Sequence, residues 1–199
     1  MFLLGLTGSI GMGKTTVAGM FMRRDIPVLS ADEVVHELYA PGGAAVQPLG
    51  AAFPGCIVND AVSRPRLSQQ IMADKAALQR LEAIVHPLVA EKRHTFLEAC
   101  RKDGRPLIVL DIPLLYETGA EKEVDAVVLV STSAEQQQSR VLERPGMTPE
   151  KLEAILQRQM PDAEKRRLAQ HLIDTGTSMN ATQQQVDKLI DKLLMSKRS

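Results

Sequence analysis

The sequence contains few aromatic residues and no tryptophan. Aromatic residues make up 3% of its 199 residues, so Leu, Val, Ile, Ala and Met must build the core. A surface with so few rings offers little for stacking single-stranded bases. The formal net charge is zero, which argues against non-specific binding to nucleic acid or to an anionic membrane. We therefore expect no nucleic-acid partner and no membrane partner.

Cysteine and long apolar runs are also scarce. Cys56 and Cys100 form neither a C-x-x-C pair nor a metal-spaced set, so we interpret them as free thiols in a reducing compartment, where packing is favoured over a redox role. No apolar run approaches the length of a membrane span. The apolar N-terminal segment lacks the basic leader of a signal peptide. A cytoplasmic location is expected.

The sequence does contain a phosphate-binding motif near its start. Residues 8–15 read GSIGMGKT and fit G-x-x-x-x-G-K-[ST]. The apolar residues 2–7 predict a short buried strand before the motif, and Val17, Met20 and Phe21 predict a helix after it. This order points backbone N–H groups and a helix N-terminus at phosphate oxygens. We expect a nucleoside-triphosphate site.

The residue types of the motif suit the parts that it plays. Glycines let the backbone turn towards the phosphates, Lys14 would reach the β- and γ-phosphates, and the Thr15 hydroxyl would ligate Mg²⁺. The predicted ATP-binding residues of this segment are Gly8, Gly11, Met12, Gly13, Lys14, Thr15 and Thr16.

Two acidic residues follow predicted strands. Asp111 closes the apolar run 107–110, which is the form of the second nucleotide motif, whose Asp holds Mg²⁺ directly or through water. Asp32 follows the run 26–29, at the end of a strand where ligands gather in parallel sheets. Asp32, or Ser30, could instead cap the helix expected after it. Position alone does not decide between these two interpretations of Asp32.

Strands alternate with helices along the chain, which predicts an α/β fold with a three-layer, doubly wound parallel sheet. Residues 44–103 show helical spacing without a clear strand and indicate an inserted helical subdomain. His86-Pro87 is expected to interrupt its helical pattern. The predicted parts of the single domain are a core (residues 1–36, 104–140 and 168–199), a helical substrate-binding insertion (about residues 37–103) and a helical lid (about residues 141–167).

Arg140 and Arg144 have the spacing of residues on one face of a helix. Ordinary surface charge is the usual interpretation of such a pair. Here Pro145-Gly146 follows directly, and Thr148-Pro149 begins another helix. Short arginine-bearing helices joined by Pro-Gly are also what a mobile lid over phosphates would look like.

Two classes of phosphate-loop protein compete, a small kinase and a GTPase-like switch. A switch needs an Asn-Lys-x-Asp guanine motif and an Asp-x-x-Gly segment, and neither occurs in the sequence. A third class, an ATPase motor, usually has more sequence and oligomer-building parts. The small kinase is favoured.

The sequence resembles the dephospho-coenzyme A kinase family, over nearly the whole chain. The most specific part is the run Asp-x-Pro-Leu-Leu-x-Glu at residues 111–117 together with His86-Pro87. The other matching segments are residues 5–16, Ala31-Asp32, Arg140, Arg144, Gln159, and Ile173-Asp174 before Gly176.

The resemblance implies transfer of the ATP γ-phosphoryl group to the ribose 3′-hydroxyl of dephospho-coenzyme A, with ATP and Mg²⁺ as cofactors. It implies small-molecule substrates only, and we expect a monomer or small homo-oligomer. The predicted catalytic residues are Lys14, Asp32 and Arg140. Further predicted ATP contacts are Arg144, Asp174 and Gly176. The predicted contacts to the acceptor are Asp32, His86, Leu115 and Glu117. The predicted metal-binding residues are Thr15 and Asp111.

Two residues depart from the family pattern. Thr175 stands where the family usually has Asn, in the turn expected to meet the adenine, so that contact would fall to the backbone of residue 175. Pro145 stands where the family often has Asp, and it would stiffen the hinge of the lid.

Overall fold

The computed structural model describes residues 1–72 and 74–195 of the chain. It contains two compact units, one made of Met1–Val28 and Cys100–Ser199 and the other of Leu29–Ala99. Each unit has a hydrophobic core of its own. Among the residues described, no helix has both the length and the apolar character needed to cross a membrane. The finer division into core, insertion and lid stays a prediction.

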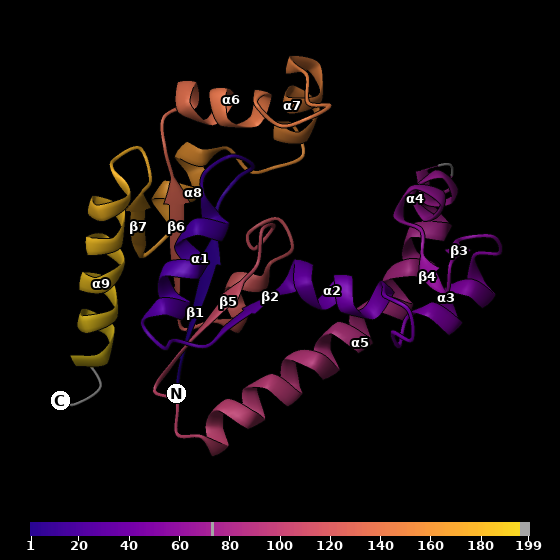
Figure 1. Ribbon diagram of the computed structural model, residues 1–199, viewed down its shortest axis with the longest axis horizontal. Coiled ribbons are helices and arrows are strands. Elements are labelled where there is room, and N and C mark those ends of the chain that lie inside the picture. Colours follow the sequence, from indigo (N-terminus) through magenta and orange to yellow (C-terminus); the bar gives the residue numbers. More distant parts are fainter. Residues whose placement is uncertain (73, 196–199) are drawn as a thin grey trace. The chain divides into compact units, whose positions relative to one another are not determined.

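A five-stranded sheet with the strand order β2-β5-β1-β6-β7 organises the first unit, which contributes all of its strands except the last two residues of β2 (Figure 1). The strands are β1 (Phe2–Thr7), β2 (Val28–Ser30), β5 (Leu107–Asp111), β6 (Ala126–Ser131) and β7 (His171–Asp174). The pairs β1–β5, β1–β6 and β6–β7 are parallel, and Leu4 of β1 lies opposite Val109 and Ala126. Every residue of β5 and β6 is buried. This burial explains why their sequences are nearly continuous apolar runs and do not alternate with polar residues. The predicted doubly wound α/β fold is confirmed.

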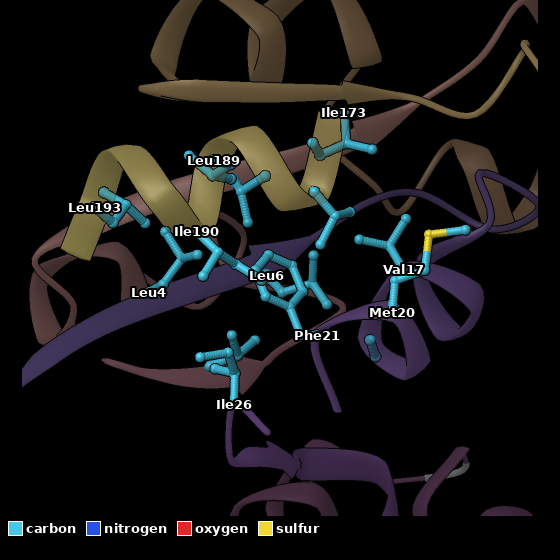
Figure 2. Packing of buried hydrophobic residues seen from close by; sticks show 14 of the residues in the cluster. Leu4, Leu6, Val17, Met20, Phe21, Ile26, Ile173, Leu189, Ile190 and Leu193 are labelled. Carbon is cyan, nitrogen blue, oxygen red and sulfur yellow. The ribbon is translucent and has the colours of Figure 1, made fainter. Parts of the chain in front are cut away.

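The helices α1 and α9 cover one face of this sheet (Figure 2). The helices of this unit are α1 (Lys14–Arg23), η1 (Ala120–Glu123), α6 (Ala134–Leu142), α7 (Pro149–Leu156), α8 (Asp162–Leu168) and α9 (Met179–Met195). Leu4 and Leu6 of β1 lie in one buried cluster with Phe21 of α1 and Ile190 of α9. Burying each such side chain contributes roughly 1.5–3 kcal/mol. This packing fixes α1, and with it the loop that precedes α1, on the central strand.

The opposite face of β1 is packed by the segment after β5. Gly5 alternates with Leu4 and Leu6 along the strand and so faces the other way. A β-carbon at Gly5 would lie only 2.6 Å from Cδ1 of Leu115. Leu115 is fully buried and therefore locks the loop after β5 onto the sheet.

The second unit is mainly helical. Its elements are α2 (Ala31–Tyr39), α3 (Val46–Ala52), β3 (Ile57–Val58), β4 (Ala61–Val62), α4 (Arg64–Met72) and most of α5 (Lys75–Lys102). Its core gathers Leu38, Leu49, Phe53, Leu67 and Val85 from four of the helices and the loop after α3. The helical character expected of residues 44–103 is thus observed.

The second unit also contains a hairpin that the sequence did not predict. β3 and β4 pair antiparallel, and Asn59 and Asp60 between them have φ of 50° and 59°. Positive φ at both central residues suits a two-residue type I′ turn, which Asn and Asp tolerate. Each strand has only two residues, too few to give an alternating pattern.

The expected interruption at His86-Pro87 is wrong. α5 runs from Lys75 to Lys102 with Pro87 inside it. Pro87 lacks the N–H that would bond the carbonyl of Ala83. Since Ala83, His86 and Pro87 are all exposed, water can satisfy that carbonyl, and the remaining helical bonds keep α5 continuous.

Candidate active site

The phosphate-binding motif forms the turn between β1 and α1. Gly11 and Gly13 have φ of 79° and 87°, which residues with a β-carbon rarely adopt. A β-carbon at Gly11 would also lie 2.5 Å from Cγ2 of Val141. Gly13 is the N-cap of α1 and provides no side-chain cap. The first N–H groups of α1 are therefore left for an anion.

Lys14 and Asp111, predicted from separate motifs, meet in this site. Lys14 Nζ donates to Asp111 Oδ1 over 2.5 Å, and the two side chains are 13% and 6% exposed. β1 and β5 are neighbouring parallel strands with Leu6 opposite Asp111, so their carboxyl ends bring loop and acid together. Thr15 and Thr16 are exposed at the start of α1. A cation, a carboxylate and exposed hydroxyls suit a phosphate with a divalent metal.

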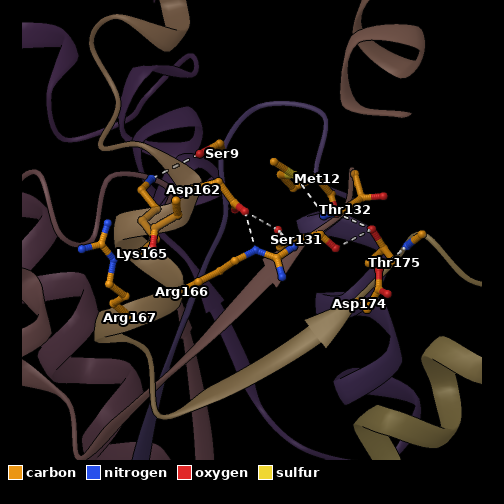
Figure 3. Close-up of polar contacts among 12 residues, drawn as sticks. Ser9, Met12, Ser131, Thr132, Asp162, Lys165, Arg166, Arg167, Asp174 and Thr175 are labelled. Carbon is orange, nitrogen blue, oxygen red and sulfur yellow. Dashed lines mark hydrogen bonds and ion pairs between the residues drawn. The ribbon is translucent and has the colours of Figure 1, made fainter. Parts of the chain in front are cut away.

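Three polar side chains from the region after β6 hold the start of the loop. Gln137 Nε2 donates to the Ile10 carbonyl over 2.8 Å, and the Ile10 N–H donates to Gln159 Oε1 over 3.2 Å. Lys165 Nζ donates to Ser9 Oγ over 3.4 Å (Figure 3). Of the three, only Gln159 belongs to a motif found in the sequence. Gln137 and Lys165 stand in polar stretches without a pattern that would mark them.

Glu117 is bound within the protein through one carboxylate oxygen. Its Oε1 lies 2.8 Å from Lys165 Nζ and accepts the Met160 N–H over 2.8 Å. Its Oε2 is buried and has no hydrogen-bond partner among the described residues. Burial alone raises the pKa of Glu117, but hydrogen bonds from Lys165 and the backbone outweigh it, so the pKa lies below its ordinary value. Glu117 is therefore a carboxylate, and its acceptor contact stays a prediction.

Arg140 reaches the turn after β7. Its Nη1 donates to Thr175 Oγ1 over 3.0 Å and its Nη2 to the Thr175 carbonyl over 2.7 Å. The Thr175 hydroxyl donates in turn to the carbonyl of Met12 over 2.7 Å. The Gly176 N–H donates to Asp174 Oδ1 over 2.7 Å and shapes the turn. The structure thus joins the predicted ATP contact Met12 to Arg140 through Thr175.

Arg144 does not share a helix face with Arg140. α6 ends at Leu142, and Arg144 is exposed in the turn before Pro145, with its N–H donating to the Val141 carbonyl. The spacing prediction is wrong because the helix ends between the two arginines. A contact of Arg144 with ATP stays a prediction.

Leu115 contributes its side chain to the core. It lies within the segment of residues 111–117, is fully buried and packs on Gly5. The predicted acceptor contact of Leu115 is not tested by this packing and stays a prediction.

The second unit carries Asp32 and His86, the two remaining predicted acceptor residues, and both are exposed. Ser30 is the N-cap of α2, because its Oγ accepts the Glu33 N–H over 3.3 Å. The interpretation of Asp32 as the cap is therefore wrong. Asp32 lies in the first turn of α2, where the helix dipole favours a negative charge.

The fold and the site together define the class of the protein. A parallel sheet whose central strand opens into a phosphate loop, with a carboxylate at the end of the neighbouring strand, is the arrangement of a P-loop nucleotide-binding protein, the class that includes small kinases.

Comparisons with known proteins place the chain within this class. A family model described as dephospho-CoA kinase matches residues 2–181. The chain is 53% identical over 193 residues to the dephospho-CoA kinase of Mesorhizobium japonicum, covering 97% of each. It is 50% identical over 191 residues to that of Rhodopseudomonas palustris, covering 96% of this chain and 95% of the relative. The chain belongs to the dephospho-CoA kinase family, and the resemblance found in the sequence is confirmed.

Two solved structures share the fold of this chain. A Thermus thermophilus protein superposes with a TM-score of 0.82 at 31% identity, covering 95% of each chain. The dephospho-CoA kinase of Campylobacter jejuni superposes with a TM-score of 0.72 over 98% of each chain. The second pair is 22% identical, so that similarity supports the fold alone.

Proposed function

We propose that this chain transfers the γ-phosphoryl group of ATP to the ribose 3′-hydroxyl of dephospho-coenzyme A, giving coenzyme A and ADP. The observation that carries the proposal is the identity of 53% and 50% to relatives named dephospho-CoA kinase, over nearly the whole chain. The phosphate loop with Lys14 supports ATP as the donor.

The donor side of the site would hold the phosphates by charge and by backbone N–H groups. Lys14 is the last residue but one of the phosphate-binding motif and the first residue of α1. Its ammonium pairs with Asp111 beside the loop. Phosphoryl transfer depends mainly on positioning and on neutralising charge. The part of Lys14 would therefore be to bind and orient the transferred group.

The residues present fit Mg²⁺. Among residues 1–72 and 74–195 no group of three or more His, Cys, Asp or Glu side chains could hold a metal. Mg²⁺ in kinases is bound by one or two protein oxygens and otherwise by phosphates and water, so Thr15 and Asp111 are a suitable set. Bound there, Mg²⁺ would supply neutralising charge to the phosphates.

On the acceptor side, Asp32 would accept the proton of the attacking hydroxyl. Ser30 caps α2, so the exposed Asp32 carboxylate is not used for capping. His86 and the partly buried Glu117 would orient the acceptor nucleotide, together with Leu115. Residues of about 37–103 would bind the pantetheine arm, whose remote contacts help to align the reacting hydroxyl.

Arginine would complete the site at the transferred phosphate. Arg140 and, from the turn after α6, Arg144 would stabilise the charge that develops in transfer. Residues of about 141–167 would form a lid whose hinge is stiffened by Pro145. Asp174 and Gly176 would meet the nucleotide from the turn after β7.

A reducing compartment, the cytoplasm, suits the two cysteines. Cys56 and Cys100 are buried and free, and burial raises the pKa of both thiols. Such thiols react slowly and serve packing. We expect a monomer or a small homo-oligomer.

One acceptor assay tests the function. The protein is incubated with ATP and Mg²⁺ and with dephospho-coenzyme A, nucleoside monophosphates, nucleosides or shikimate in parallel, and ADP release and product mass are measured. We expect rapid phosphorylation of dephospho-coenzyme A and little of the rest. Lys14→Ala is the control for enzyme-dependent transfer, and omission of Mg²⁺ is the control for the metal.

The other outcomes distinguish the alternatives. Rapid transfer to a nucleoside monophosphate, with none to dephospho-coenzyme A, would overturn the acceptor and keep the kinase. ATP hydrolysis that no acceptor stimulates would favour a switch or an ATPase instead.

A further inference from the structure

One hydroxyl joins three distant segments of the chain beside the phosphate loop. Thr175 follows β7, is only 7% exposed, and lies near Met12 (Figure 3). Its Oγ1 donates to the Met12 carbonyl over 2.7 Å and accepts from Arg140 Nη1 over 3.0 Å. A second carbonyl, that of Ser131, lies 3.4 Å from Oγ1, so the single hydroxyl proton belongs to the shorter bond to Met12.

The backbone of residue 175 strengthens the same junction. Its carbonyl accepts Arg140 Nη2 over 2.7 Å, so the guanidinium is held by two acceptors of one residue. The Thr175 N–H donates to the carbonyl of Ser131 over 2.9 Å, which ties the turn to β6. Both acceptors that Thr175 offers to Arg140 are uncharged, so these two bonds add no negative charge that would compete with an anionic ligand for the guanidinium.

Thr175 also lies against the residue that precedes Lys14. A β-carbon at Gly13 would come within 3.2 Å of Thr175 Oγ1 and 3.3 Å of Cγ2. Gly13 is the left-handed N-cap of α1. Thr175 therefore limits where the backbone at the start of α1 can lie, through packing as well as through the hydrogen bond.

We propose that Thr175 is a positioning residue that links Arg140 to the phosphate loop through its hydroxyl. The hydroxyl sets the Met12 carbonyl, and with it the N–H groups that follow, while it holds the guanidinium beside them. Loop and arginine are thus prearranged for the same polyphosphate. The expected effect on turnover rests on the proposed kinase function. The expected effect on ATP binding does not, since binding can be measured without the reaction.

The branched side chain suits this role. Thr has one strongly restricted χ1 angle, so its hydroxyl is held where a donor to Met12 and an acceptor for Arg140 are needed at once.

Two substitutions at this position separate the hydroxyl from the packing. Thr175→Val keeps the shape and removes both bonds, and we expect the Kd and the KM for ATP to rise about tenfold, as for a buried carbonyl that loses its partner. Thr175→Ser restores the hydroxyl and should return ATP binding to within about threefold of wild type. The KM for the acceptor should stay unchanged in both variants.

Thr182→Val is the matched control. Thr182 is 2% exposed, and its hydroxyl also donates to a backbone carbonyl, that of Asp174, over 3.3 Å. It therefore reports the general cost of losing a buried threonine hydroxyl in this region. We expect a similar loss of stability in Thr182→Val and Thr175→Val, with ATP affinity changed only in Thr175→Val.

A double-mutant cycle tests the link to Arg140. In an Arg140→Met background, Thr175→Val should weaken ATP binding clearly less than about tenfold, because one of the two linked groups is already gone. Equilibrium binding of ATP is the measurement, and thermal unfolding shows that each variant is folded.

Several results would overturn the proposal. A folded Thr175→Val protein that binds ATP as wild type does would exclude it, as would equal losses in Thr175→Ser and Thr175→Val, which would assign the effect to packing on Gly13. Full additivity with Arg140→Met would exclude the link. Failure of the proposed function looks different, because wild type would then bind ATP but leave dephospho-coenzyme A unphosphorylated.

Discussion

The ammonium of Lys165 lies 2.8 Å from the carboxylate of Glu117, with the lysine side chain fully buried and that of Glu117 15% exposed. Glu117 follows β5, whereas Lys165 belongs to α8 and also reaches Ser9 of the phosphate loop. Removing one partner of a buried pair leaves the other charge without compensation in a medium of low dielectric constant. The pair therefore holds together two segments that both border the phosphate loop.

We expect Lys165→Met to lower the free energy of unfolding by about 3–5 kcal/mol, because it leaves the mostly buried Glu117 carboxylate without its ion-pair partner. Glu117→Gln should be destabilising as well, and the double variant should lose less than the sum of the two single losses. Urea unfolding measures all three. Arg167→Met, an exposed position of the same helix, is the control and should stay within about 0.5 kcal/mol of wild type. Additive losses would show that the ion pair is not the source of the effect.

Ser30 and Asp32 should have separable effects. Ser30→Ala removes the cap of α2 and should lower stability by about 1 kcal/mol while turnover is kept. Asp32→Asn should leave stability nearly unchanged and slow turnover by about 10²–10⁴-fold, because Asn cannot accept a proton. Thermal unfolding and steady-state kinetics measure both variants. Retained activity in Asp32→Asn would remove the residue from the chemistry.

Pro87 should limit the stability of α5. Pro87→Ala restores a helical N–H in the interior of the helix, and we expect the free energy of unfolding to rise by about 1–3 kcal/mol. Pro65→Ala is the matched control, because Pro65 lies in the first turn of α4, where the N–H has no helical partner. Its stability should not rise. Destabilisation by Pro87→Ala would mean that the ring packs favourably in the native state.

His171 should make stability depend on pH near neutrality. Burial and, after it, the charge of Lys192 lower the pKa of His171 in the folded protein. The stabilisation of the neutral form is then present above the unfolded pKa of about 6.5 and is lost as the pH falls through the folded pKa. When the pH is lowered from about 7.5 to about 5.5, the free energy of unfolding should fall less in His171→Gln than in wild type, as measured by urea unfolding. The exposed His94 of α5 provides the control His94→Gln, and equal slopes in the wild type and His171→Gln would contradict the assignment.

The features that could be predicted from the sequence are local. The strand, loop and helix around Gly13 follow from glycine chemistry and apolar spacing over a few residues, and the strand that ends at Asp111 follows from an unbroken apolar run. The rule that ligands gather at the carboxyl ends of strands places Lys14 and Asp111 at the same edge of the sheet. That β1 and β5 are neighbours, and that the two side chains pair, is known only from the structure.

Other features depend on partners that lie far away in the sequence or on where a helix ends. Burial of Lys165 is decided by Glu117 and Ser9, and no spacing within α8 shows it. Arg144 leaves the face of Arg140 because α6 stops at Leu142. Ser30 is the N-cap, and not Asp32, because it lies immediately before the first helical residue of α2. The two candidates are two residues apart, which is within the usual uncertainty of a predicted helix boundary.

The two tyrosines give the protein a built-in pair of optical reporters. The sequence has two tyrosines and no tryptophan, and Tyr39 lies in one compact unit while Tyr116 lies in the other. Intrinsic emission therefore comes from one dominant fluorophore in each unit. Tyr39→Phe leaves a signal from Met1–Val28 with Cys100–Ser199 alone, and Tyr116→Phe leaves a signal from Leu29–Ala99 alone. Unfolding and ligand titrations of this chain can thus be followed unit by unit without any attached dye.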